Sequence, residues 1–167
     1  RAYLARKDLR SNNDRLMEYV RNGGVYIVQY NKVDDWKPGK YLPYPARMDR
    51  NERITDENAP MQILKPGHPV FCQPNRITTA DFEGWIQERG LYFLTAWDER
   101  YIPLLSGSDP GEDPLMGGLL VAEYGKGLVV YTGLSWFRQL PAGVPGAYRL
   151  FANLISLPMT RHSNGPP

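Results

Sequence analysis

A helical stretch that ends in two glycines and leads directly into a short apolar run constrains the fold most strongly. Residues 8–24, "DLRSNNDRLMEYVRNGG", carry apolar side chains at near-helical spacing: Leu9, Leu16, Tyr19 and Val20. Asp8 is a suitable N-cap, and Gly23-Gly24 is typical of a helix end. Residues 25–30, "VYIVQY", are almost continuously apolar, as a strand covered on both faces is. The pattern is half of a βαβ unit and predicts an α/β layer fold.

Further along the chain, helical and strand-like segments alternate. Residues 76–90, "RITTADFEGWIQERG", predict a second, shorter helix that ends at Gly90. The runs 91–97, "LYFLTAW", and 102–106, "IPLLS", predict strands, and 117–133, "GGLLVAEYGKGLVVYTG", predict an antiparallel hairpin. Residues 146–157, "GAYRLFANLISL", predict a closing helix, and we expect the tail 158–167 to be disordered. We therefore expect an open α/β sheet flanked by helices, with a hairpin near the C-terminus.

Composition excludes several classes of protein. Lys and Arg number 20 against 18 Asp and Glu, and the charges form no basic stripe, so we expect no nucleic-acid partner. The longest apolar runs, 119–122 and 128–131, are far below the roughly 20 residues of a membrane span, so the chain is typical of a soluble protein. A single cysteine excludes an internal disulfide but leaves the compartment open.

Long stretches of the sequence resemble a known family. They are "DLRSNNDRLMEYVRNGGVYIVQYN", "ITTADFEGWIQERGLYF" and "DPGEDPLMGGLLVAEYGKGLVVYTGLSWFRQLPAGVPGAYRLFANLISL". They look like the carboxy-terminal, class I glutamine amidotransferase-like domain of large bacterial PIG-L family deacetylases. More distantly, "AEYGKGLVVYTG" is similar to the end of ThuA-like domains of trehalose utilisation. The resemblance covers about residues 1–157.

The resemblance implies a flavodoxin-like sheet in a module that follows a zinc-dependent deacetylase domain. Such a sheet usually begins with a strand, whereas this chain opens on a helix, so we expect amino-terminal strands of the domain to lie outside these residues. The deacetylase motif of Ala-His-Pro-Asp-Asp type is absent from the sequence, so neither the zinc site nor the deacetylase activity carries over. We expect no metal site and no cofactor in this segment. The localisation stays open, because a chain with one cysteine fits a reducing compartment and equally fits export as part of a larger bacterial protein.

The only cysteine does not match an amidotransferase nucleophile. Cys72 lies in "HPVFCQPN", without the flanking glycines of the Gly-x-Cys-x-Gly elbow that the resemblance requires. Where the active enzymes carry a histidine after the final hairpin, this chain has Leu134 and Ser135. Pro66 and Pro69 disfavour a helix that would stack His68 on Cys72. We expect Cys72 to be a small buried hydrophobe and His68 to cap a turn.

Ligands of open α/β sheets bind beyond the carboxyl ends of the strands, which selects the candidate site. The residues that follow the predicted strands are Gln29, Tyr30, Asn31, Trp97, Asp98, Arg100, Trp136, Arg138 and Gln139. Aromatic rings, amides and a guanidinium suit a carbohydrate, because rings stack on a sugar while polar groups bond its hydroxyls. The alternative is an aromatic rim that packs on a neighbouring domain.

Two functions remain open at this point. In the first, the chain is a catalytically silent accessory domain that contacts the deacetylase domain of the same polypeptide, a second copy of itself, or a carbohydrate. In the second, it is a hydrolase or amidotransferase-type enzyme with an unorthodox site in which Asp98 or Glu88 acts as the base. The absence of an elbow cysteine and a hairpin histidine favours the first.

Overall fold

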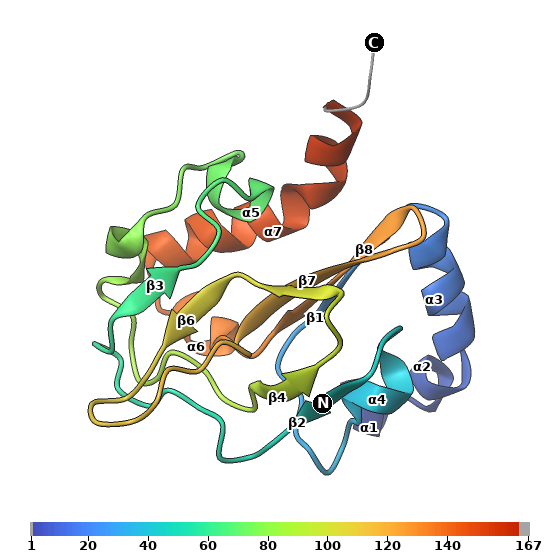
Figure 1. Ribbon diagram of the computed structural model, residues 1–167, viewed down its shortest axis with the longest axis horizontal. Coiled ribbons are helices and arrows are strands. Elements are labelled where there is room, and N and C mark those ends of the chain that lie inside the picture. The colour runs from blue at the N-terminus through green and yellow to red at the C-terminus, as the bar shows by residue number, and fades with distance from the viewer. Residues whose placement is uncertain (1, 164–167) are drawn as a thin grey trace.

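The centre of the fold is a four-stranded mixed sheet of order β1-β8-β7-β5 (Figure 1). The computed structural model describes residues 2–163, without the side chains of residues 158–163. The strands of this sheet are β1 (Val25–Val28), β5 (Tyr101–Pro103), β7 (Leu119–Tyr124) and β8 (Gly127–Thr132). β1 runs parallel to β8, with Val28 opposite Tyr131, and the other two pairs are antiparallel. The predicted hairpin is confirmed as β7 and β8.

Two short antiparallel pairs lie outside the main sheet. β2 (Ala46–Met48) pairs with β4 (Leu94–Trp97), and β3 (Met61–Ile63) pairs with β6 (Leu105–Gly107). The run 91–97 therefore supplies a strand, but not one of the central sheet. Because β4 pairs with β2, the carboxyl end of β4 does not lie beside the carboxyl ends of β1 and β8.

The helices on the amino-terminal side are α1 (Ala2–Ala5), α2 (Lys7–Ser11), α3 (Asn13–Arg21) and α4 (Pro38–Tyr41). Those that follow are α5 (Pro69–Cys72), the 3-10 helix η1 (Thr79–Phe82), α6 (Trp136–Gln139) and α7 (Pro145–Ser163). The first predicted helix is divided in two, because Asn12 has non-helical backbone angles and ends α2. The closing helix is confirmed as α7, which continues past the expected boundary at 157, and the last part of the expected tail, 164–167, lies outside the described residues.

The prediction of a second helix within residues 76–90 is wrong beyond the first turn. Only η1 forms, and the chain then takes positive φ angles at Gly84, Gln87 and Glu88. The backbone groups that a helix would pair with each other have side-chain partners instead: Phe82 O accepts from the Arg89 guanidinium, and the Ile86 N–H donates to Gln139 Oε1. Buried side-chain bonds therefore override the local helical pattern.

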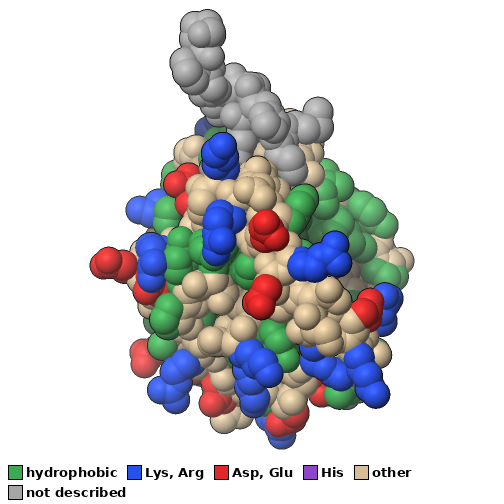
Figure 2. All heavy atoms as spheres, turned by 90° about the vertical axis from the view of Figure 1, so that its right-hand side faces the viewer, with side chains coloured by type: hydrophobic (Ala, Val, Ile, Leu, Met, Phe, Trp, Pro, Cys, Tyr) green, Lys and Arg blue, Asp and Glu red, His purple; other side chains and the backbone are tan. Residues whose placement is uncertain are grey.

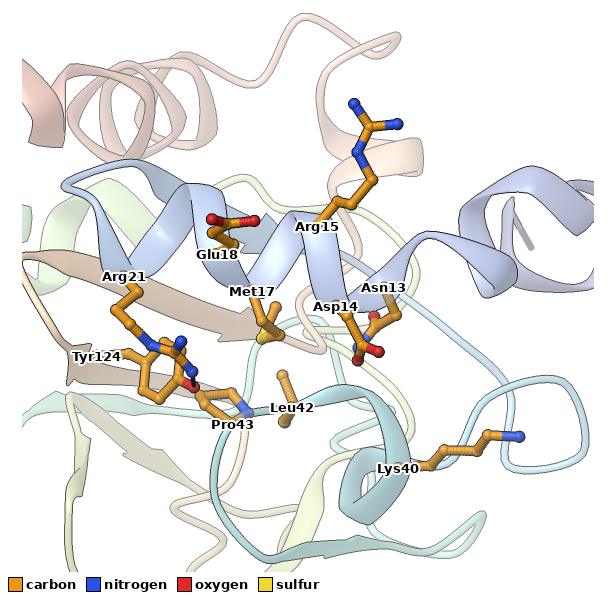
Figure 3. A pocket seen from close by; sticks show the side chains of 10 residues that line it. All are labelled: Asn13, Asp14, Arg15, Met17, Glu18, Arg21, Lys40, Leu42, Pro43 and Tyr124. Atoms are coloured by element: carbon orange, nitrogen blue, oxygen red, sulfur yellow. Dashed lines mark hydrogen bonds between the residues drawn. The ribbon is translucent and has the colours of Figure 1, made fainter.

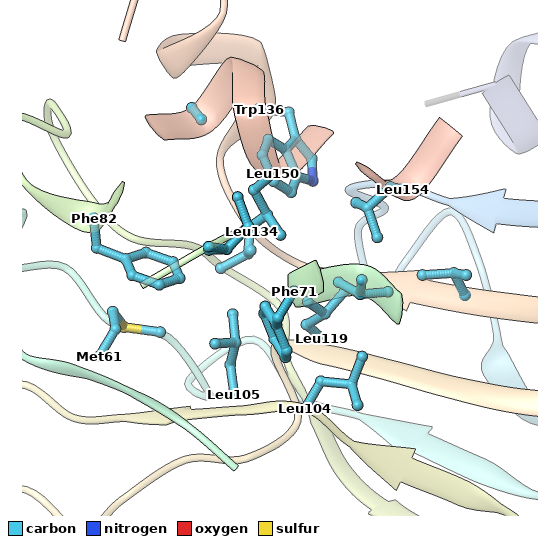
Figure 4. Close-up of a cluster of buried hydrophobic side chains, with 14 of the residues drawn as sticks. Met61, Phe71, Phe82, Leu104, Leu105, Leu119, Leu134, Trp136, Leu150 and Leu154 are labelled. Atoms are coloured by element: carbon cyan, nitrogen blue, oxygen red, sulfur yellow. The ribbon is translucent and has the colours of Figure 1, made fainter. Parts of the chain in front are cut away.

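The sheet separates two apolar cores because successive side chains of a strand point to opposite faces. On β7, Leu119 and Val121 join the core under α7, whereas Leu120 and Ala122 join the core under α1, α3 and α4. Figure 4 shows the first core, with Phe71, Leu119 and Trp136 converging between the sheet and the helices. The observed architecture confirms an open α/β sheet with helices on both faces. No helix within the described residues is long and apolar enough to cross a membrane.

Candidate functional site

The carboxyl ends of β1 and β8 lie side by side because the two strands are parallel neighbours. The segment 29–31 leaves β1 at this edge, and 133–135 leaves β8 and enters α6. A third segment joins them, since Gly90 bridges Leu134 on one side and Ile54 on the other. The residues gathered here form what we call the carboxyl-edge cluster: Tyr30, Glu88, Tyr92, Phe137 and Arg138.

The cluster presents an aromatic surface. The Tyr30 ring centroid is 4.9 Å from that of Phe137 and 5.4 Å from that of Tyr92. Phe137 is 48% exposed, while Tyr30 and Tyr92 are half-buried. Burial, followed by the neighbouring Tyr92 and Glu88, raises the pKa of the Tyr30 hydroxyl. The hydroxyl therefore stays neutral and is a hydrogen-bond donor at any physiological pH.

One ion pair borders the aromatic surface. Arg138 Nε donates to Glu88 Oε1 at 3.2 Å, and its Nη1 donates to Gln87 Oε1 at 3.1 Å. The same guanidinium lies 5.1 Å from the Phe137 ring centroid. The Glu88 side chain is 10% exposed and that of Arg138 33%. Since the acceptors of Glu88 and Gln87 hold the guanidinium over the ring, Arg138 has a fixed orientation at the surface.

Buried side chains hold the segment that carries Glu88. Its φ of +88° is a left-handed value that a residue with a Cβ adopts at a cost. Ser135 Oγ donates to Glu88 O at 2.7 Å, and Gln139 Nε2 donates to Ile86 O at 2.7 Å. Gln139 Oε1 also accepts from the Ile86 N–H at 2.9 Å. Ser135 and Gln139 are fully buried, so both act as anchors of the segment and not as surface groups.

Two of the residues expected at a ligand surface lie in the interior. Trp136 is 2% exposed, packs between Trp85 and Phe151, and donates from Nε1 to Thr132 Oγ1 at 3.0 Å. Gln139 is 0% exposed. The physical reason is that α6 begins where β8 ends and turns Trp136 inward. The neighbouring Phe137, which the sequence reasoning missed, is turned outward.

Asn31 is also buried, at 5% exposure, and its Nδ2 donates to Gln29 O at 2.7 Å. Gln29 itself is exposed. Of the residues expected from the sequence, Tyr30 and Arg138 therefore come together in the carboxyl-edge cluster. The sequence did hold a signal for both rings: Phe137 directly follows Trp136, and Tyr92 lies two residues after Gly90.

The residues after β4 lie away from this edge. The Arg100 guanidinium is 3.7 Å from the Tyr44 ring centroid and lines a pocket with Glu123 and Gly125, at the hairpin turn before β8. Arg100 and its ion-pair partner Asp98 therefore lie on the amino-end side of β8, opposite to the expectation. Trp97, the last residue of β4, lies beside β2, because β4 pairs with β2 and not with the main sheet. Hydrogen bonding from Arg100 holds the pKa of Asp98 at about 2.

Cys72 and His68 do not form a catalytic pair in this arrangement. The Cys72 thiol donates to Pro66 O at 3.2 Å, and His68 Nδ1 accepts from the Val70 N–H at 3.2 Å. His68 thus caps α5, as expected, and burial lowers its pKa. The expectation that Cys72 is buried is wrong: it is half-exposed, because it ends a one-turn helix at the surface.

A further pocket, of about 480 Å³, lies between α3 and the segment that follows α4 (Figure 3). Figure 3 shows Arg21 beside the Tyr124 ring at one end, with Met17 and Leu42 forming the floor. Acidic and basic side chains both line it, so it favours no single charge. Over the face shown in Figure 2, Lys and Arg are likewise interspersed with Asp and Glu. The described residues contain no group of three His, Cys, Asp or Glu side chains placed to hold a metal ion.

The observed mixed sheet, with helices on both faces and two small antiparallel pairs beside it, confirms the expected fold class of an open α/β sheet. No protein-family model and no curated protein matches the chain. Among solved structures it is similar to Cytoplasmic Protein STM3548 from Salmonella typhimurium, with a TM-score of 0.52 and 18% identity over 87% of this chain. It is less similar to a cold-adapted beta-galactosidase from Rahnella sp. R3, with a TM-score of 0.45 and 13% identity over 89% of this chain.

The chain spans 59% of the Salmonella protein and 20% of the beta-galactosidase. At these identities the likeness shows the fold alone. Membership of the PIG-L-associated family stays a prediction from the sequence.

Proposed function

We propose that this chain is an amidotransferase-like accessory domain that acts by binding, and that it docks on a PIG-L type, zinc-dependent deacetylase domain. The observation that carries the proposal is the carboxyl-edge cluster. The edge where such folds hold their ligands presents the rings of Tyr30, Tyr92 and Phe137 with an oriented Arg138.

The chemistry of this edge supports binding more than catalysis. The Ser135 hydroxyl is buried and donates to Glu88 O, so it offers no free nucleophile. Glu88 and Asp98, the bases that an unorthodox enzyme would need, are each bonded to an arginine, Arg138 and Arg100. Aromatic and arginine side chains are instead the residues enriched at the energetic centres of protein interfaces.

The test is a calorimetric titration of the chain with a separately purified PIG-L type deacetylase domain. Phe137→Ala is expected to weaken binding about tenfold or more, because it removes a largely exposed anchor. Ile102→Ala is the matched control, since Ile102 is 43% exposed on β5, away from the cluster. Equal losses for the two variants, or no binding by the unaltered chain, would refute docking through this edge.

A carbohydrate is the second candidate ligand, and one observation favours it. Trp97 is half-buried and lines a pocket of about 260 Å³ with Arg47 and Asp98. A ring beside charged groups suits the apolar face and the hydroxyls of a sugar. Titration with a panel of amino sugars, compared between the unaltered chain and Trp97→Ala, tests it. A sugar that binds equally to both proteins would place its site elsewhere.

A further inference from the structure

The two outer strands of the main sheet differ in how they are protected. β5 is three residues long and ends in Pro103, which has no N–H to donate to a further strand. β1, "VYIV", has no proline, no charge and no glycine. Natural sheets protect their exposed edges with such residues, because an open apolar edge pairs with other chains. The contrast indicates that β5 is an edge strand protected against further pairing, whereas β1 is suited to pair with a further strand.

The hydrogen-bond register shows which backbone groups of β1 are open. Leu128 N donates to Gly24 O at 3.0 Å, and Val25 is the partner of Leu128 in the parallel ladder. Backbone groups alternate between the two sides of a strand, so those of Tyr26 and Val28 face β8. The N–H and C=O groups of Val25 and Ile27 then face the other side, where no strand pairs with β1 among the described residues.

A groove runs along this open side. Its volume is about 270 Å³, and it is lined by the consecutive residues 26–31 together with Tyr3 and Leu9. Successive side chains of a strand point to opposite faces of the sheet, so a groove on one face would be lined by every second residue. A groove lined by consecutive residues therefore lies along the edge of the strand. At its far end Asn31 Nδ2 bonds Gln29 O and so closes the edge with a side chain. The backbone groups that remain open on this side are therefore those of Val25 and Ile27.

Both faces beside the open edge are apolar. Val25 and Ile27 are half-buried and pack on the core beneath α7, while Tyr26 packs on the core beneath α3. A strand placed next to β1 would complete both cores, so it needs apolar side chains on both faces.

We propose that the β1 edge binds an extended, apolar strand from an adjoining domain by main-chain hydrogen bonding. This inference rests on the proposed docking function and adds a second contact, at β1, to the one at the carboxyl-edge cluster. A second copy of this chain is the less suitable occupant, because β1 offers only four residues. So short an edge buries far less than the ~800 Å² per partner of a stable interface between free proteins. A strand on an adjoining domain has a high effective concentration and needs less area.

The experiment uses the whole chain and a synthetic peptide with a Val-Ile-Val-Ile core and lysines at both ends, supplied at roughly millimolar concentration to match the effective concentration of a strand on an adjoining domain. Amide hydrogen exchange is measured with this peptide and with a matched peptide that has prolines in the core. We expect the first peptide to slow exchange at Val25 and Ile27 by about tenfold or more, and the proline peptide to leave it unchanged. Leu9→Lys, which places a charge in the groove wall, is expected to abolish the effect, whereas Ile102→Lys on β5 is not.

Three results would overturn the proposal: unchanged exchange at β1, equal protection by the proline peptide, or protection at β5 instead. A dimer in sedimentation that Leu9→Lys dissociates would make a second copy the occupant and would overturn it as well. The circular dichroism spectrum of each variant establishes that it folds. Because no deacetylase is present, this experiment fails or succeeds independently of the docking titration.

Discussion

Ser135 Oγ donates a hydrogen bond of 2.7 Å to the carbonyl oxygen of Glu88, a residue with a φ of +88°. The bond joins the end of β8 to the segment that carries one side of the carboxyl-edge cluster. By the resemblance to amidotransferases, this is the region where active enzymes place a histidine. Here the same region holds a backbone anchor, and the neighbouring surface consists of rings and a guanidinium.

Ser135→Ala should lower the free energy of unfolding by about 0.5–1.5 kcal/mol, because it removes the short bond to Glu88 O and one acceptor of Gln139 Nε2, while Gln139 Nε2 keeps its bonds to Ile86 O and Glu88 O. Urea unfolding measures the change. The control Ser108→Ala alters a half-exposed serine and should stay within about 0.5 kcal/mol. Rapid modification of Ser135 by a fluorophosphonate would contradict the structural role and revive a nucleophile.

The backbone of Glu88 leads to a second prediction. Glu88→Gly and Glu88→Ala both remove the carboxylate that accepts from Arg138, but only glycine adopts a φ of +88° without strain. Glu88→Gly should therefore be more stable than Glu88→Ala by about 1 kcal/mol or more. Thermal unfolding of the two variants measures the difference. Equal stabilities would mean that the segment relaxes away from this conformation.

The sequence was sufficient for those parts of the fold that local pattern determines. The hairpin is set by two continuous apolar runs on either side of the turn at Gly125, and α7 by an apolar stripe, and both were predicted. The segment 83–90 was not predicted, because Ser135 and Gln139 bond its backbone from positions about 50 residues away, which no local pattern reveals. Long-range side-chain bonds decided its conformation.

The candidate site was predicted in part for a similar reason. The position of Tyr30 follows from β1 alone, since the residue after a buried strand lies at the sheet edge. The position of Trp97 depends on which strand β4 pairs with, and the pairing with β2 joins residues far apart in the chain. Whether Trp136 or Phe137 faces outward depends on the direction in which α6 leaves β8, which hydropathy does not specify.

Two tryptophans expected at one surface should behave differently. Trp136→Ala should cost about 3–5 kcal/mol, because it opens a cavity in the core and leaves Thr132 Oγ1 without the indole donor. Trp97→Ala should cost less, since its ring is only half-buried and lies at the border of the second core. Guanidinium unfolding of both variants gives the comparison. A small loss of unfolding free energy for Trp136→Ala would mean that Trp136 lies at the surface, as the sequence suggested.

His68 should make stability depend on pH. Burial lowers its pKa in the folded state, so the unfolded chain binds the proton more readily, and stability falls as pH drops below the unfolded value of about 6.5. Protonation also removes the Nδ1 acceptor that caps the Val70 N–H. His68→Asn keeps a capping acceptor without titrating, and it should remove this component between about pH 7 and pH 5. Parallel profiles for the two proteins would show that His68 is not the titrating group.

Arg138→Lys tests whether the geometry of the guanidinium, and not its charge, matters at the carboxyl-edge cluster. The planar group donates to Glu88 and Gln87 while it lies over the Phe137 ring, and an ammonium on a flexible stem does not hold these contacts together. We expect a loss of about 0.5–1 kcal/mol in unfolding free energy, a modest value because Arg138 is 33% exposed. Docking to the deacetylase domain should weaken more than stability does, since a reoriented cation no longer presents the same surface. Calorimetric titration and thermal unfolding of the same preparation separate the two effects. If the lysine variant docks as tightly as the unaltered chain, then Arg138 contributes only its charge, and the aromatic rings alone define the docking surface.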